Sequence, residues 1–280
     1  MKQKGNSSFV IFFKQFPKLL LATVIFAVFL AAFMAISILV GMLTGFNNII
    51  VSGLGIIPAT LFLPGLVMVI RKYAVEKEFA PVIPTFFEAV RDNFKQFILH
   101  GFVIYAIVAC STFAIIYYGI GAFSSAVYSA VFTIYLLFSF VLLVMLFYLP
   151  IMAVTYELRI RDLYKNSLLL VFGTVLKNLA ALAYTLIIGA AAILLLVYTE
   201  RFWRYISLGI IVILCPLLIG YGVISIIAKG LQENVGVFVG VATQPKEMLT
   251  EEEKTVAKEL SSDDDYIFVN GKMIKNPNKQ

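Results

Sequence analysis

Six long stretches without Asp, Glu, Lys or Arg constrain the fold of this chain more than any other feature. About 20 apolar residues in a helix cross the roughly 30 Å of hydrocarbon in a bilayer. A helix also satisfies its own backbone hydrogen bonds where no water is present. The sequence therefore predicts an all-α fold, a polytopic transmembrane helical bundle with six spans. The spans cover approximately residues 19–45, 48–70, 97–120, 124–152, 178–198 and 205–228.

The composition excludes an ordinary water-soluble enzyme. Apolar residues make up 61% of the chain and charged residues 14%, whereas soluble domains have about 45–50% and about 25%. The first apolar stretch has 27 residues, more than the apolar core of a signal peptide, so we expect an uncleaved anchor. The net charge of +6 comes from residues that flank the spans. The expected partner is therefore the lipid bilayer with its anionic headgroups, and not nucleic acid.

Basic residues near the span ends predict the orientation. Thirteen lie in three segments that share one side if every stretch spans the membrane, and two lie on the other side. Because positive charge accumulates on the cytoplasmic side, we expect both termini in the cytoplasm. The predicted parts are a cytoplasmic segment at 1–18, a transmembrane domain at 19–228 and a cytoplasmic tail at 229–280. The thirteen residues are Lys2, Lys4, Lys14, Lys18, Arg71, Lys72, Lys77, Arg91, Lys95, Arg159, Arg161, Lys165 and Lys177.

Four residues are candidate anchors at the membrane interface. Lys72, Lys95 and Arg159 are expected on the cytoplasmic side, where long basic side chains reach the headgroups. Trp203 is expected on the outer side, because indole rings favour the interface.

Two of the cytoplasmic connections have apolar residues at helical spacing. Residues 82–98 and 160–175 each combine an apolar face with a charged face, which is typical of helices at the lipid–water boundary. We expect two interfacial helices that lie in the headgroup plane before the chain turns into the next span. The two segments align at an offset of 82 residues, which indicates either a duplicated hairpin unit or shared amphipathicity.

Small residues recur at every fourth position in four of the spans. Membrane helices associate where small side chains let backbones approach, so these stripes are the predicted packing seams between helices. The stripes are Ala27, Ala31 and Ala35; Ala106, Cys110 and Ala114; Ala122, Ala126 and Ala130; and Ala181, Thr185 and Gly189.

Three prolines are expected to kink or interrupt spans. Pro58 and Pro64 lie in the second span and Pro216 in the sixth, where each removes a backbone hydrogen bond. A broken helix at mid-depth exposes carbonyls to a substrate in some transporters. A kink accommodated by neighbouring helices is the simpler interpretation.

The spans contain few groups that could carry chemistry. Ion-coupled carriers keep acidic, basic or histidine residues at mid-depth, and the cores of the six spans contain none. His100 is the only histidine and lies about one turn inside the third span, where we expect an anchor or a hydrogen-bond donor. Cys110 and Cys215 are expected to be small core residues. One histidine and two separate cysteines do not make a zinc site, so we predict no cofactor and no enzymatic activity.

The tail contains two local signals. Thr250–Glu253 fits a capping box for a helix that ends near Leu260. The acidic residues Asp263–Asp265 lack the spacing of a calcium loop. Strand-like segments at 266–269 and 272–275 flank Asn270-Gly271, which is a strong hairpin signal. Since a lone hairpin is marginal in water, we expect it to dock on the bundle or a partner, or to be partly disordered.

Several short motifs occur in the second span and before the third and fifth spans: Ile57–Thr60, Phe86-Phe87, Asn93–Gln96, Lys165–Leu170 and Lys177–Leu179. They resemble those of the YesL-like family of bacterial membrane proteins, whose defining domain has no assigned activity. The resemblance covers roughly residues 20–225, and this chain departs from it at residues 61–64 and in its longer tail. Members often accompany carbohydrate-uptake systems, so the resemblance implies a bacterial plasma membrane and such a setting.

Three functions remain open at this point. The first is a non-enzymatic accessory protein that meets the subunits of a membrane transport system through its cytoplasmic amphipathic helices. The second is a permease-like subunit of an ABC-type transporter whose ATPase is a separate chain, because no GxxxxGK[ST] segment occurs. The third is a membrane-embedded enzyme that acts on lipid and uses Glu157 or Asp162.

Overall fold

The computed structural model describes residues 8–46, 48–156, 158–238, 266–269 and 272–275. Six helical stretches are long and apolar enough to cross a membrane: Val10–Thr44, Ile49–Glu76, Val82–Gly119, Ala126–Thr155, Val175–Tyr198 and Arg201–Ala228. This confirms the predicted all-helical bundle of six spans. The elements are α1 (Ser8–Thr44), α2 (Ile49–Gly53), α3 (Ile56–Ala59), η1 (Thr60–Phe62), α4 (Leu63–Arg71), η2 (Lys72–Glu76), α5 (Val82–Ala114), η3 (Ile115–Gly119), α6 (Ala126–Thr155), α7 (Ile160–Gly173), α8 (Val175–Tyr198), α9 (Arg201–Phe238), β1 (Tyr266–Val269) and β2 (Lys272–Lys275).

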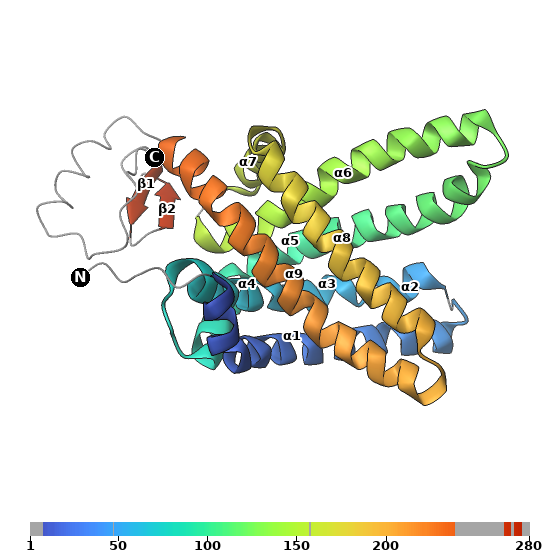
Figure 1. The fold of residues 1–280 in the computed structure, drawn as a ribbon, viewed down its shortest axis with the longest axis horizontal. Coiled ribbons are helices and arrows are strands. Elements are labelled where there is room, and N and C mark those ends of the chain that lie inside the picture. Colours follow the sequence, from blue (N-terminus) through green and yellow to red (C-terminus); the bar gives the residue numbers. More distant parts are fainter. Residues whose placement is uncertain (1–7, 47, 157, 239–265, 270–271, 276–280) are drawn as a thin grey trace, which may run out of the picture.

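The long helices run back and forth between two ends of the bundle. The start of α1, helix α7 and the end of α9 lie at one end (Figure 1). The end of α1, the start of α2 and the connections 120–125 and 199–200 lie at the other. We call the first end the basic end, because the chain segments that carry most of the lysines and arginines of the membrane domain meet there.

Buried side chains concentrate toward the basic end. They include Ile70, Tyr73, Phe86, Met152 and Ile227, which form one continuous core. At the opposite end α6 stands apart from α8 and α9 (Figure 1), and its side chains are mostly exposed. Because lipid tails are as apolar as leucine, association of membrane helices depends on close packing. The basic end is where this bundle packs most closely.

The second span is divided into short pieces. Pro58 lies in α3, and Pro64 lies in the first turn of α4, directly after the 3-10 turn η1. Thr60 donates a hydrogen bond from Oγ1 to the carbonyl oxygen of Ile57 at 2.7 Å. By contrast, Pro216 lies inside α9, which is helical from Arg201 to Phe238.

The prediction of a separate interfacial helix at 82–98 is wrong. Helix α5 runs without a break from Val82 to Ala114, so this segment is the first part of the third span. The only proline of the segment, Pro84, lies in the first turn, where helices tolerate it. The apolar face of this segment packs against protein, because Val82, Phe86 and Phe97 are buried in the core.

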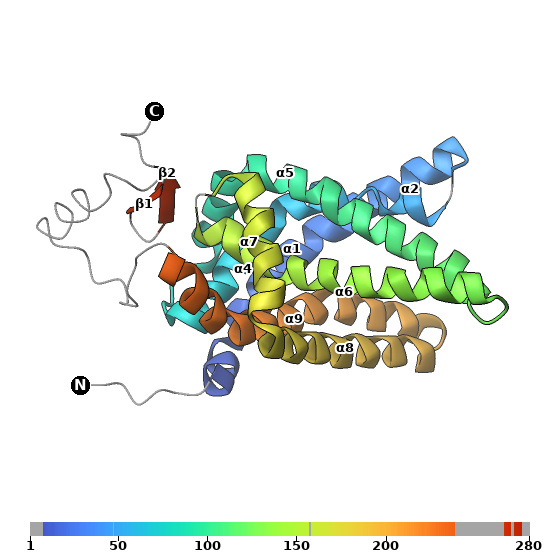
Figure 2. The same ribbon diagram turned by 90° about the horizontal axis from the view of Figure 1, so that it is seen from above.

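The second predicted interfacial helix is confirmed as a separate helix. Helix α7 ends at Gly173, and Thr174 leaves helical geometry with φ −131° and ψ 45°. α7 crosses the direction of the long helices (Figure 2). Since α7 is separate and 82–98 is not, the two connections do not share one structure.

The small-residue stripes are mostly not packing seams within this chain. Ala27, Ala114 and Ala181 are buried, one from each of three stripes. Thr185 is half-buried and donates to the carbonyl oxygen of Ala181. Gly189 is half-buried as well, and a Cβ added there would meet nothing within 4 Å. The prediction is wrong for the exposed members, because spacing alone does not select the face that meets another helix; they are Ala31, Ala35, Ala106, Cys110, Ala126 and Ala130.

The close approaches occur at glycines outside these stripes. A Cβ on Gly55 would lie 2.5 Å from the carbonyl oxygen of Phe33, and one on Gly101 would lie 2.6 Å from that of Ile57. These two glycines let the second span contact α1 and α5 backbone to backbone.

The predicted hairpin strands are confirmed. β1 pairs with β2 in antiparallel register, with Tyr266 opposite Lys275 and Val269 opposite Lys272. The predicted helix at 250–260 and the acidic residues 263–265 lie outside the described residues.

Candidate functional site at the basic end

Helix α7 has one face in the core and one face outside it. Leu163 and Ser167 are buried, as are Leu170 and Val171. On the outer face, Leu169 is 58% exposed and Phe172 66%. This outer apolar face is open to contact with lipid or with a protein partner.

A buried polar cluster fixes the turn from α7 into α8. Asn178 is 1% exposed. Its Nδ2 donates to the carbonyl oxygens of Leu170 at 3.0 Å and Val171 at 2.8 Å, and its Oδ1 accepts from the Tyr148 hydroxyl at 2.6 Å. The Tyr148 hydroxyl also lies 2.7 Å from Oγ1 of Thr174. Asn178 therefore gives a side-chain donor to two carbonyl oxygens in the last turn of α7, and the cluster ties α6, α7 and α8 together.

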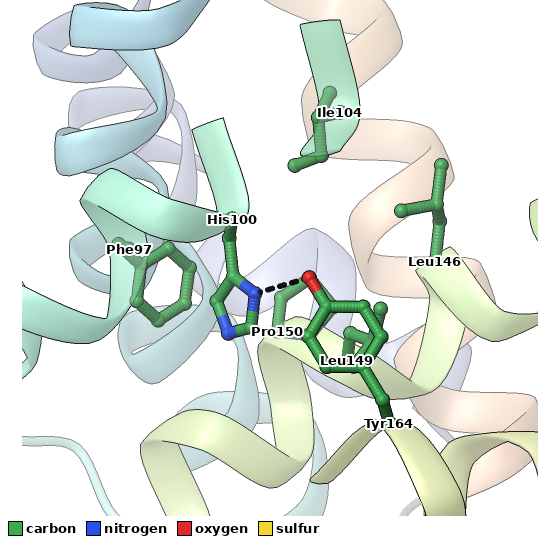
Figure 3. Close-up of a pocket in the computed structure, with 7 residues that line it drawn as sticks. All are labelled: Phe97, His100, Ile104, Leu146, Leu149, Pro150 and Tyr164. Carbon is green, nitrogen blue, oxygen red and sulfur yellow. Dashed lines mark hydrogen bonds between the residues drawn. The ribbon is translucent and has the colours of Figure 1, made fainter. Parts of the chain in front are cut away.

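A second polar contact joins α7 to the third span. Nδ1 of His100 lies 2.9 Å from the hydroxyl oxygen of Tyr164. The two rings point toward each other between α5 and α7, and the ring of Phe97 packs against the imidazole (Figure 3). His100 is 3% exposed, so the predicted role as a hydrogen-bonding residue agrees with its position.

The space around His100 is too small for a substrate. The cavity lined by His100, Tyr164 and Pro150, among others, has a volume of about 10 Å³, which is close to the minimum for one water molecule. Among the described residues, Nε2 of His100 has no hydrogen-bond partner. Burial raises the pKa of Tyr164 to about 12, so its phenol is neutral at physiological pH.

A larger and more polar cavity lies between α5 and the connection from α6 to α7. Its volume is about 260 Å³. The amide of Gln96 donates from Nε2 to the carbonyl oxygen of Leu158 at 3.2 Å across this space. The lining residues are Asp92, Asn93, Gln96, Ala153, Val154, Tyr156 and Leu158.

Arg71 borders the α6–α7 connection from the second span. Its guanidinium forms an ion pair with Glu76 and donates from Nη1 to the carbonyl oxygen of Val154 at 3.4 Å. Burial raises the pKa of Tyr156, and the nearby charge of Arg71 offsets part of that rise. The ion pair is mostly buried. Through its hydrogen bond to Val154, Arg71 links the second span to the fourth.

The four predicted anchors differ in exposure, and their role at the membrane interface stays a prediction. Lys72 is half-buried in η2, Lys95 is exposed in α5, and Arg159 is exposed directly before α7. Trp203 is 67% exposed near the start of α9.

The residues considered for chemistry do not converge. Asp162 is half-buried in α7, and Glu157 lies outside the described residues. Cys110 is exposed and Cys215 is half-buried, in different helices. Within the part of the chain that the structure describes, no three His, Cys, Asp or Glu residues come together as a metal site would require.

No direct sequence signal identifies the hydrogen-bonded pairs at this site. Asn178 and Tyr148 are single polar residues in apolar stretches, and a buried partner is the usual reason for a polar residue there. That signal identifies candidates but not which residues pair. No family model matches the chain, and comparisons with curated proteins and with solved structures found no match.

Proposed function

We propose that this integral membrane protein is a non-enzymatic accessory protein of a membrane transport system and that partner subunits bind at its basic end. The outer face of α7 carries the proposal. Leu169 and Phe172 are exposed there, while the opposite face of the helix is buried in the core. An apolar surface on a rigid support is what a helix-binding or sheet-binding partner requires, because little conformational entropy is lost on association.

The membrane, its orientation and the transport system are proposed from the sequence. The basic residues favour an orientation with the basic end in the cytoplasm. The resemblance to the YesL-like family favours a bacterial plasma membrane and a carbohydrate-uptake system. The orientation is tested by replacing Lys165 with Cys in a chain that also carries Cys110→Ala and Cys215→Ala. A membrane-impermeant thiol reagent should label this site only after the membrane is opened.

A permease-like subunit of an ABC-type transporter is the second candidate. The position of α7 across the ends of the long helices favours it, because such a helix could receive motion from a separate ATPase. Reconstituted vesicles that contain candidate ATPases should then show ATP-dependent solute flux, whereas an accessory protein alone should show none.

Co-purification from membranes in mild detergent tests the proposed function. The change is Leu169→Ser with Phe172→Ser, and the matched control is Ile187→Ser with Leu186→Ser, because these residues are exposed on α8. Subunits of a transport system should co-purify with the wild type and the control but not with the α7 variant. Equal recovery of the same proteins with both variants would place the binding surface elsewhere and contradict the proposal.

A further inference from the structure

The cavity of about 260 Å³ between α5 and the α6–α7 connection is rich in hydrogen-bond acceptors. The amide of Asn93 donates from Nδ2 to the carbonyl oxygen of Ala89 at 2.8 Å, and that of Gln96 donates to Leu158. These bonds occupy amide N–H groups and leave the side-chain oxygens. Among the described residues, no hydrogen bond reaches Oδ1 of Asn93 or Oε1 of Gln96.

Asp92 adds a negative charge to this cavity. Nε of Arg91 lies 3.4 Å from Oδ1 of Asp92, but the side chains are 81% and 47% exposed. An exposed pair of this kind is weak and easily exchanged. A carboxylate and two amide oxygens therefore suit a ligand that brings N–H donors and positive charge. A primary ammonium group is such a ligand, because it has three donors and no acceptor.

The cavity lies where the charged first part of α5 gives way to its apolar stretch. On α5 the last charged residue is Lys95, and the apolar stretch begins at Phe97. On α6, which has no charged residue, the lining residues Ala153 and Val154 come just before the end of the helix. A bilayer whose hydrocarbon begins at this apolar stretch would have its headgroups beside the cavity.

The residues around the cavity suit the acyl chains and the phosphate of a lipid. Leu99 follows Gln96 by one turn of α5 on the same face, and its side chain is exposed where acyl chains would run. Lys95 and Arg159 are exposed and adjoin the lining residues Gln96 and Leu158 in sequence. Their charges favour a phosphate at the rim.

We propose that this cavity binds the headgroup of an aminophospholipid, with the ammonium group among Asp92, Asn93 and Gln96 and the phosphate near Lys95 and Arg159. The site goes beyond the proposed partner surface on α7. It makes the chain sensitive to the kind of lipid at its basic end, independently of any protein partner.

Native mass spectrometry of the purified full chain tests this site. The chain is exchanged into micelles doped with phosphatidylethanolamine, phosphatidylcholine or phosphatidylglycerol. Phosphatidylethanolamine should be retained about tenfold more strongly than phosphatidylcholine, whose quaternary ammonium has no N–H donor. Phosphatidylglycerol has no amine and should also be retained less. Equal retention of the three lipids would overturn the proposal.

The residue test uses two matched variants. Asp92→Asn should reduce the retention of phosphatidylethanolamine about tenfold, because a charge-assisted hydrogen bond is lost. Glu88→Gln makes the same charge change at an exposed position one turn earlier on α5, and retention should not change. Both replaced side chains are exposed, so both variants should keep the wild-type unfolding temperature. Equal behaviour of the two variants would contradict the assignment of Asp92.

Competition with free ethanolamine tests whether the ligand of the cavity is a lipid or a soluble amine. At millimolar concentration it should not displace phosphatidylethanolamine, because it lacks the phosphate and the acyl chains. Displacement by ethanolamine would show that the cavity is a site for soluble amines, and the lipid assignment would be wrong.

Discussion

Nδ1 of His100 lies 2.9 Å from the hydroxyl oxygen of Tyr164, so a residue of the third span holds the surface helix α7. Sixty-four positions separate the two residues in sequence. The contact, together with the cluster around Asn178, explains why α7 keeps one position while its outer face stays exposed.

Removal of the Tyr164 hydroxyl should destabilise the bundle. Tyr164→Phe leaves both ring nitrogens of the buried His100 without a partner among the described residues. We expect a loss of about 1–3 kcal/mol, the cost of an unsatisfied buried polar group. Thermal unfolding in detergent measures it. Tyr205→Phe, at an exposed tyrosine of α9, is the control, and an equal effect of both changes would show that the contact contributes nothing.

Alkaline pH should weaken the same contact. Burial raises the pKa of Tyr164 to about 12, while an unfolded tyrosine has a pKa of about 10. The folded chain therefore holds this proton more tightly, so the stabilisation is complete below pH 10 and is lost as the pH rises from about 10 through about 12. The difference in unfolding temperature between the wild type and Tyr164→Phe should shrink over that range. A constant difference would contradict the assigned pKa.

Replacement of Asn178 should release α7 from the bundle. Asn178→Leu leaves the Tyr148 hydroxyl and the carbonyl oxygens of Leu170 and Val171 without this partner, at a cost of about 2–3 kcal/mol. Limited proteolysis should then cut near α7 faster than in the wild type. Asn166→Leu is the control on α7, because the described residues offer Asn166 no hydrogen bond. Equal cleavage of both variants would exclude the proposed role of Asn178.

The close contact between α3 and α5 should depend on Gly101. Gly101→Ala places a Cβ 2.6 Å from the carbonyl oxygen of Ile57, so α5 and α3 must separate, at a cost of about 1–3 kcal/mol. Gly189→Ala has open space and should be neutral or slightly stabilising. Unfolding temperatures of the two variants measure the difference. A larger loss for Gly189→Ala would restore the seam predicted at Ala181, Thr185 and Gly189.

The number of spans and the basic end could be predicted because each depends on local composition. Bilayer thickness fixes how many apolar residues a span needs, and charges are excluded from such stretches. The separate helix α7 was also predictable, since apolar residues recur at helical spacing from Ile160 opposite a charged face.

Contacts between helices were not predictable in the same way. The segment 82–98 has the pattern of an interfacial helix, but the pattern does not say whether its apolar face meets lipid or protein. Phe86 and Phe97 meet protein. Likewise, the spacing of Ala106, Cys110 and Ala114 does not reveal which helix face has a neighbour, whereas Gly55 and Gly101 lie at close contacts outside any repeat. Such contacts depend on the three-dimensional arrangement of several helices.

Photo-cross-linking in native membranes tests the proposed accessory role most directly. A photoreactive amino acid replaces Phe172 on the outer face of α7 or, as the control, Ile187 on α8, both exposed in the chain. Mass spectrometry identifies the products. Cross-links from position 172 to subunits of a membrane transport system, absent from position 187, are the predicted result. Cross-links from position 172 to lipid alone would contradict the proposal that partner subunits bind at α7.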